Sequence, residues 1–252
     1  TPSVSWCQQN CVFCWRPLTP PAKFPKDFSE PKEIVEESIA RQRVLLSGYG
    51  ALREQIGDKK LEEAMNPNQV AISLAGEPTL YPALPELVKE YGRQGFTSFV
   101  VSNGLETEMI SNLKPTQLYL SLEAANEKMH LKLNSPAEKD SWKKLNNSLE
   151  IMPSIKTRKA IRVTAIKGLN MSDEKDFASL IEKARPDFVE VKAYMFVGYS
   201  RKRLAEENMP LYDEVLDFAE KINKHLGYTI ACESKPSRVV LLSSGKTKRE
   251  ID

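Results

Sequence analysis

Short apolar segments alternate with longer amphipathic segments along most of the chain. The apolar segments are rich in β-branched and aromatic residues, which is typical of buried strands. We expect these strands at residues 70–74, 99–102, 117–122, 160–166 and 188–192. The amphipathic segments carry apolar residues three and four positions apart, and this spacing predicts helices. The predicted helices span residues 33–46, 52–65, 84–94, 139–151, 173–184 and 211–226.

This alternation predicts an α/β protein built on a parallel sheet. Residues 4–6 supply one more strand ahead of the others, which makes six strands of this kind. Two further short strands, 229–233 and 238–242, are expected to form a hairpin or an edge ladder. In parallel α/β sheets, functional residues gather where the carboxyl ends of the strands meet the following loops.

The unusual residues of the chain follow these strand ends. Three cysteines come after the first strand, Gly76-Glu77-Pro78 after the second and Asn103-Gly104 after the third. Residues 121–123 end the fourth strand, and residues 192–194 follow the sixth. A purely structural α/β protein does not need this coincidence, so we expect one functional site at this edge of the sheet.

The composition is that of an ordinary globular chain. Of the 252 residues, 41% are hydrophobic and 28% are charged, which suits one large domain or two small ones. No apolar run approaches the ~18 residues that suggest a membrane helix, and no signal-peptide pattern is present, so we expect a cytoplasmic protein without a membrane partner. Because the chain begins at Thr1-Pro2-Ser3 without a methionine, we expect it to be part of something longer.

The cysteine spacing is the strongest chemical signal. Cys7, Cys11 and Cys14 are separated by three and two residues, and Cys232 is far away. A secreted disulfide scaffold is shorter and richer in cysteine. Structural zinc generally takes four ligands in two pairs, and neither of the two histidines lies near a second ligand. Three thiolates in one tight loop instead suit a [4Fe-4S] cluster whose fourth iron is open to an external ligand.

The motif Cys7-x3-Cys11-x-Phe13-Cys14 resembles the signature of the radical S-adenosylmethionine (SAM) superfamily. In that superfamily the open iron binds SAM, whose reductive cleavage gives a 5′-deoxyadenosyl radical. The segment Ala75-Gly76-Glu77-Pro78 resembles the glycine-rich GGEP motif of the superfamily, with alanine in place of the first glycine. The resemblance implies a partial (β/α)6 barrel, which we expect over residues 1–228, followed by a C-terminal β extension and basic tail over residues 229–252.

A narrower resemblance covers nearly the whole chain. The most specific blocks are Trp15-Arg16-Pro17 directly after the cysteines and Gly198-Tyr199-Ser200-x-x-Arg203-Leu204, and Ser102-Asn103-Gly104 adds a third. Together they resemble the wyosine-synthesis enzymes of archaeal tRNA, the 4-demethylwyosine synthases. The resemblance implies condensation of pyruvate-derived carbons with N1-methylguanosine-37 of tRNA(Phe), with an electron donor as a further partner and a monomeric enzyme. Where that family commonly has Asp, this chain has Glu123.

The same family carries a second [4Fe-4S] cluster and a pyruvate-handling lysine upstream of the region matched here. Both are therefore expected upstream of Thr1, and no catalytic residue is assigned within the chain. Cys232 is the only remaining cysteine and cannot supply three ligands.

The charge distribution supports an RNA partner better than the net charge of +2 does. Residues 1–26, 153–168 and 191–205 contain basic residues and no acidic ones. Acid-free runs of this kind, two of which follow strand ends, predict a phosphate-binding surface. Reaching the target base requires its extrusion, and Tyr194, Phe196 and Tyr199 are candidates to stack on it.

The expected site residues fall into three groups. The iron ligands are Cys7, Cys11 and Cys14. The residues expected to position SAM are Gly76, Glu77, Asn103, Ser121 and Arg162, the last because its guanidinium fork suits a carboxylate of SAM or pyruvate. The residues expected to contact substrate are Lys192, Tyr194, Tyr199, Ser200, Arg201 and Arg203.

Two alternatives remain open at this point. The first is another radical SAM enzyme, an activase or a small-molecule synthase, that shares the cluster and does not act on tRNA. The second is a zinc-stabilised RNA-binding module without enzymatic activity, which analysis of the bound metal distinguishes.

Overall fold

The computed structural model describes residues 6–17 and 27–251. The strands are β1 (Gln69–Ile72), β2 (Thr97–Ser102), β3 (Gln117–Ser121), β4 (Arg158–Ala165), β5 (Phe188–Ala193), β6 (Thr229–Ser234) and β7 (Val239–Ser243). The α-helices are α1 (Pro31–Leu46), α2 (Arg53–Ile56), α3 (Asp58–Met65), α4 (Leu84–Arg93), α5 (Thr107–Asn112), α6 (Glu127–Asn134), α7 (Ser141–Ile151), α8 (Glu174–Ala184) and α9 (Tyr212–Leu226). The 3-10 turns are η1 (Ser47–Leu52), η2 (Pro78–Leu80), η3 (Met152–Ser154), η4 (Gly198–Lys202) and η5 (Glu206–Asn208).

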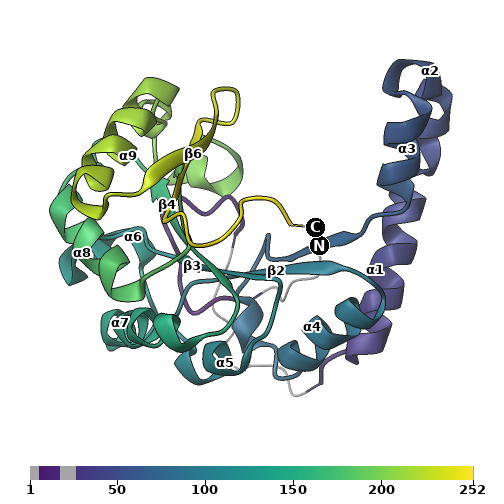
Figure 1. Cartoon of the computed structure of the whole chain (residues 1–252), viewed down its shortest axis with the longest axis horizontal. Coiled ribbons are helices and arrows are strands. Elements are labelled where there is room, and N and C mark those ends of the chain that lie inside the picture. Colours follow the sequence, from purple (N-terminus) through teal and green to yellow (C-terminus); the bar gives the residue numbers. More distant parts are fainter. Residues whose placement is uncertain (1–5, 18–26, 252) are drawn as a thin grey trace.

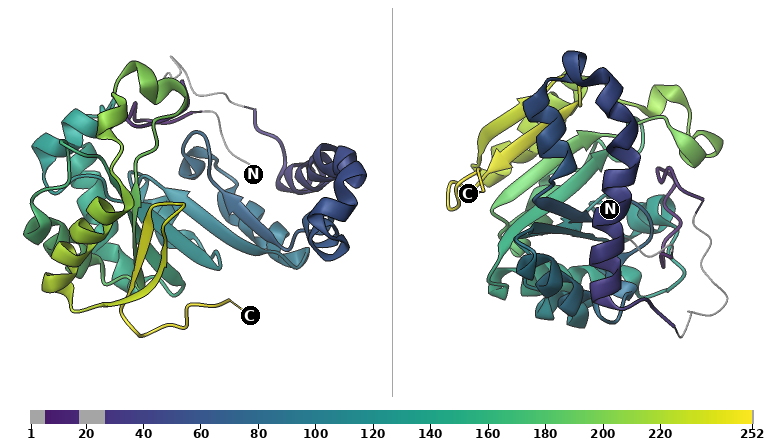
Figure 2. Two further views of the ribbon diagram at one scale, coloured as in Figure 1. Left: turned by 90° about the horizontal axis from the view of Figure 1, so that it is seen from above. Right: turned by 90° about the vertical axis from the view of Figure 1, so that its right-hand side faces the viewer.

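The strands form one curved sheet in the order β1-β2-β3-β4-β5-β7-β6. Neighbours from β1 to β5 are parallel, and β7 is antiparallel to both β5 and β6. Helices cover the outer face of the sheet, and the sheet does not close on itself (Figures 1 and 2). The predicted α/β fold, an open barrel with a parallel sheet, is confirmed.

The core lies between the sheet and its helices. Strand β2 alternates buried and half-buried residues, and its buried Val100 belongs to the same apolar cluster as Leu87 and Tyr91 of α4. Helices α8 and α9 pack through Phe177 and Phe218, whose rings meet edge to face at 5.7 Å. Because the outer face takes up these apolar side chains, the inner face is left for polar side chains.

The predicted helix at residues 52–65 is not continuous. Gly57 has φ of +86° and separates α2 from α3, since an L-residue rarely adopts this conformation. The short helices α5 and α6 were not among the predicted elements. Residues 4 and 5 of the predicted first strand lie outside the described residues.

The C-terminal hairpin continues the sheet rather than lying apart from it. Val240 and Leu242 of β7 are fully buried and face β5 partners across the ladder. The tail then crosses the inner face, where the Arg158 guanidinium donates to the carbonyl oxygens of Lys248 and Arg249. The division of the chain at residue 228 stays a prediction. Among the described residues, no helix is both long and apolar enough to cross a membrane.

Candidate active site at the carboxyl ends of the strands

A cavity of about 300 Å³ opens where the carboxyl ends of β1 to β4 meet the cysteine segment, defined as residues 7–16. All of the predicted cofactor residues line it. The lining residues are Cys7, Gln9, Cys11, Phe13, Cys14, Trp15, Ser73, Leu74, Ala75, Gly76, Glu77, Val101, Ser102, Asn103, Ser121, Glu123, Arg162 and Thr164. The fold thus brings together all three predicted iron ligands and all five residues predicted to position SAM.

The cysteine segment is tied to helix α6 by backbone hydrogen bonds. The Val12 amide donates to the Leu133 carbonyl at 2.8 Å, and the Asn10 amide donates to the Asn134 carbonyl at 3.0 Å. Within the segment, the Cys14 amide donates to the Cys11 carbonyl at 3.0 Å. These bonds turn the chain so that the three cysteines reach one cavity.

The three cysteines are free thiols, with Cys7 buried and the other two half-buried. Burial and the nearby Glu77 carboxylate raise the pKa of Cys7 to about 12, and burial, Cys7 and Glu123 raise the pKa of Cys11 well above its ordinary value. Side chains of this kind become thiolates when a cation binds them. In the described part of the chain, no three His, Cys, Asp or Glu side chains are grouped closely enough to hold a single metal ion. The donor set, three sulfurs on one cavity wall, fits an iron–sulfur cluster.

Glu77 connects the loops that follow β1 and β2. Its carboxylate accepts hydrogen bonds from the Thr79 amide at 3.1 Å, the Thr79 hydroxyl at 2.6 Å and the Asn103 amide at 2.7 Å. The Asn103 side chain in turn donates to Gln8 Oε1 at 3.2 Å. The carboxylate is buried, and burial raises its pKa. Glu77 therefore fixes the position of Asn103 at the cavity wall.

Arg162 of β4 lies on the inner face of the sheet, where its positive charge is paired with a carboxylate. Its guanidinium donates to both oxygens of Glu190 on β5, at 2.7 and 3.3 Å, and lies 4.6 Å from the centre of the Tyr119 ring. Ser121, also predicted to position SAM, pairs with Arg162 in the β3–β4 ladder. Lys192 lies farther along β5 and does not line the cavity; burial and the charge of Arg162 lower its pKa.

The residues predicted to contact substrate lie in two different environments. Tyr194 and Ser200 are buried and bond to each other, with the tyrosine hydroxyl donating to Ser200 Oγ at 2.8 Å. Tyr199 and Arg201 are exposed. Arg203 is half-buried and points toward the cysteine segment.

Sequence reasoning did not include Glu123 and Thr164 among the site residues. Glu123 is buried in the cavity wall and accepts a hydrogen bond from Thr164 at 3.4 Å, and burial raises its pKa to about 7. A signal for both was present in the sequence, because each lies two positions beyond a predicted site residue, Ser121 or Arg162, and therefore on the same face of the sheet.

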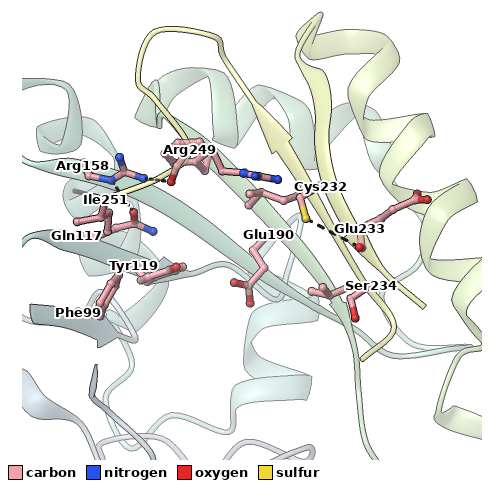
Figure 3. A pocket seen from close by; sticks show the side chains of 13 residues that line it. Phe99, Gln117, Tyr119, Arg158, Glu190, Cys232, Glu233, Ser234, Arg249 and Ile251 are labelled. Carbon is pink, nitrogen blue, oxygen red and sulfur yellow. Dashed lines mark hydrogen bonds between the residues drawn. The ribbon is translucent and has the colours of Figure 1, made fainter. Parts of the chain in front are cut away.

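A second cavity, of about 270 Å³, lies farther down the inner face (Figure 3). Gln117 and Tyr119 of β3 and Glu190 of β5 line it, and the tail residues Arg249 and Ile251 cover one side. The Arg162–Glu190 pair separates the two cavities, since Arg162 lines the cavity beside the cysteines and Glu190 lines the second cavity.

Comparison with known proteins agrees with this geometry. The radical SAM superfamily model matches residues 1–181, and the wyosine base formation model matches residues 183–244. The tRNA 4-demethylwyosine synthase of Pyrococcus horikoshii is 46% identical over 250 residues, which cover 96% of this chain and 73% of the relative. That of Methanocaldococcus jannaschii is 43% identical and covers 98% and 81%. A solved structure of TYW1 with a lysine–pyruvate adduct bound has a TM-score of 0.88 at 42% identity, covering 98% of this chain and 79% of that chain.

Proposed function

Since the chain belongs to the tRNA 4-demethylwyosine synthases of the radical SAM superfamily, we propose that its cavity binds SAM beside an iron–sulfur cluster and serves the formation of 4-demethylwyosine in tRNA. The predicted enzyme class and function are confirmed by this relationship. The family implies SAM and a [4Fe-4S] cluster as cofactors. The observation that carries the assignment of the site is the meeting of three free cysteines with the Gly76–Glu77 loop in one cavity.

Each group of residues has a proposed role. Cys7, Cys11 and Cys14 would hold three irons of the cluster, which would supply the electron for the cleavage of SAM. Gly76, Glu77, Asn103, Ser121 and Arg162 are proposed to position SAM. Gly76 has φ of +73°, which brings the backbone of its loop to the cavity. The Arg162 guanidinium suits the SAM carboxylate because it has donors besides those held by Glu190.

The substrate is proposed to be N1-methylguanosine-37 of tRNA(Phe), onto which carbons derived from pyruvate are condensed. The TYW1 structure with its lysine–pyruvate adduct supports pyruvate as the co-substrate. The proposed contacts to substrate are Lys192, Tyr194, Tyr199, Ser200, Arg201 and Arg203, and the exposure of Tyr199 and Arg201 favours these two for direct contact with RNA. A second cluster and a pyruvate-handling lysine are proposed upstream of Thr1. The enzyme is proposed to be a cytoplasmic monomer that receives electrons from a separate electron donor.

The experiment is an anaerobic reaction of the reconstituted full-length protein with reductant, SAM, pyruvate and tRNA bearing N1-methylguanosine. We expect 5′-deoxyadenosine and a modified base whose mass matches 4-demethylwyosine, and neither with Cys11→Ala. If 5′-deoxyadenosine forms while the tRNA base stays unchanged, the tRNA reaction is refuted and another radical SAM activity takes its place. Bound zinc without iron or sulfide would refute the radical mechanism itself.

A further inference from the structure

The turn formed by residues 198–203 is hydrogen-bonded to the cysteine segment, although the two are far apart in the sequence. The Tyr199 amide donates to the Trp15 carbonyl at 2.8 Å. The Arg203 guanidinium donates to Asn10 Oδ1 at 2.8 Å and, through its other terminal nitrogen, to the Cys14 carbonyl. Figure 2 shows the two segments side by side, the cysteine segment in purple and the turn in light green. One side chain therefore spans the loop that carries two of the three cysteines.

The approach of the two backbones requires a glycine at position 198. A Cβ atom at this position would lie 2.4 Å from the Trp15 carbonyl oxygen, well inside van der Waals contact. Gly198 also has φ of +59°, which favours glycine. The contact is thus built into the backbone of the turn and does not depend on the exposed side chains.

Buried hydrogen bonds and apolar packing hold the turn in place. Ser200 is fully buried, accepts a hydrogen bond from Tyr194 and donates to the Val197 carbonyl at 2.6 Å. Tyr194 belongs to a small apolar cluster in which Val12 and Phe13 of the cysteine segment also pack. The turn and the cysteine segment therefore share a core, so that displacement of one disturbs the packing of the other.

The other side of the same turn is exposed, cationic and aromatic. Arg201 and Lys202 are exposed, and the Lys202 ammonium lies 4.6 Å from the centre of the half-exposed Tyr199 ring. No acidic residue occurs between positions 191 and 205. Such a surface suits the phosphates and bases of RNA.

From these contacts we propose that the 198–203 turn couples RNA contact to the docking of the cysteine segment, and that Arg203 is the positioning residue of this coupling. The proposal rests on the proposed function for its RNA partner. The two states are the segment docked on the turn and the segment released from it. Cluster binding favours the docked state because the cysteines must converge on the iron, and RNA on the turn favours it because the turn must keep its shape. Coupling of this kind is reciprocal in binding free energy, so RNA strengthens cluster binding and the cluster strengthens RNA binding by the same factor. We expect the stronger cluster binding to slow cluster loss.

The test measures how long the cluster survives. Wild type and variants are loaded anaerobically, and iron loss to a chelator is followed by the visible absorbance of the cluster, with and without tRNA bearing N1-methylguanosine. Arg203→Met removes both hydrogen bonds, and Arg203→Lys keeps the charge without the fork. Lys221→Met is the matched control, because Lys221 is exposed on α9 and pairs with Asp217 of the same helix, at 2.7 Å. Thermal melts by circular dichroism verify that each variant is folded.

We expect tRNA to slow iron loss from wild type and from Lys221→Met. Arg203→Met should lose iron at least about tenfold faster without RNA, since the loss of even one of its two charge-assisted hydrogen bonds corresponds to that factor. We expect tRNA to give this variant no protection. Arg203→Lys should resemble Arg203→Met, since one ammonium does not span Asn10 and Cys14. In the metal-free proteins, amide hydrogen exchange over residues 8–16 should be faster in Arg203→Met than in wild type.

Equal iron loss from Arg203→Met and wild type would overturn the positioning role, and a wild-type cluster that tRNA does not protect would overturn the coupling. These outcomes differ from failure of the proposed function, in which wild type cleaves SAM and leaves the tRNA base unchanged. The iron-loss arm without RNA and the hydrogen exchange report on Arg203 in either case.

Discussion

The Arg162 guanidinium and the Glu190 carboxylate form a two-bond ion pair, at 2.7 and 3.3 Å, between the two cavities of the inner face. Both side chains are mostly buried, with 24% and 18% of their surface exposed. A planar guanidinium held at two nitrogens has a fixed orientation. Glu190 thereby directs the remaining donors of Arg162 toward the cavity proposed to bind SAM.

Glu190→Gln should weaken SAM binding, although Glu190 does not line the cavity proposed to bind SAM. Glutamine offers one neutral acceptor in place of a carboxylate, so Arg162 loses its fixed orientation. We expect the Kd for SAM to rise roughly fivefold, corresponding to about 1 kcal/mol, as measured by calorimetry on the cluster-loaded protein. Glu150→Gln, in an exposed pair with Lys183, is the control. Because the two residues act as one unit, adding Glu190→Gln to Arg162→Met should cost nothing further; additive losses would contradict the positioning role.

A second prediction concerns the buried carboxylate of Glu77. Three donors, from Thr79 and the Asn103 amide, point at its oxygens. In Glu77→Gln the amide NH2 group must face at least one of these donors, which leaves buried polar groups unpaired. We expect the metal-free protein to lose about 2 kcal/mol of unfolding free energy in urea.

The control for Glu77→Gln is Glu86→Gln. Glu86 is 58% exposed and lies 3.8 Å from Lys89, so its replacement should change the unfolding free energy by less than about 0.5 kcal/mol. If both variants unfold at the same urea concentration, Glu77 does not join the two loops in the way its hydrogen bonds indicate.

The sequence predicted those features that depend on local periodicity. The burial alternation of β2 and the buried stripe of α8, with Phe177 and Ile181, follow directly from the spacing of apolar residues. The break between α2 and α3 was not predicted, because the amphipathic pattern of residues 52–65 continues across Gly57. The positive φ of Gly57, which interrupts the helix, leaves no mark on that pattern. The open α/β fold was therefore recoverable, whereas the bounds of its irregular segments were not.

The arrangement of the site was predictable only in part. Cys7 and Glu77 are marked by sequence motifs, and their strand ends meet in three dimensions. The pairing of Arg162 with Glu190 depends on the β4–β5 register, which residue spacing alone does not give. Ser200 of η4 turns inward to bond to the nearby Tyr194, whereas Arg203, which follows η4, bonds to Asn10 of the distant cysteine segment. Long-range contacts of this kind leave no local pattern.

His130 predicts a pH dependence of stability. The ring is fully buried in α6, and Nε2 lies 3.1 Å from the Ser141 hydroxyl. Burial lowers the pKa of His130 to about 4 from 6.5. Between these values the unfolded chain binds a proton that the folded protein does not, so the unfolding free energy contributed by this group falls as the pH falls. The loss accumulated by pH 4 is roughly 3 kcal/mol.

The measurement is urea unfolding between pH 7 and pH 4. His130→Gln should flatten the fall in unfolding free energy below pH 6.5, even though it changes the stability at pH 7. His225→Gln removes an exposed histidine and serves as the matched control. Parallel curves for wild type and His130→Gln would show that His130 does not carry the acid sensitivity.

Gly198→Ala should release the cysteine segment from the turn. The added methyl group would meet the Trp15 carbonyl oxygen at 2.4 Å, and alanine is strained at φ of +59°. Since the clash is with backbone, a side-chain rotation does not relieve it, and we expect a loss of about 1–3 kcal/mol of unfolding free energy. The matched control is Gly92→Ala in α4, where a Cβ meets nothing within 4 Å and helix propensity predicts a gain of about 0.5–1 kcal/mol. Urea unfolding of the metal-free proteins gives both values, and hydrogen exchange over residues 8–16 locates the change. If Gly198→Ala is as stable as wild type, the turn and the cysteine segment do not pack as closely as their backbones indicate.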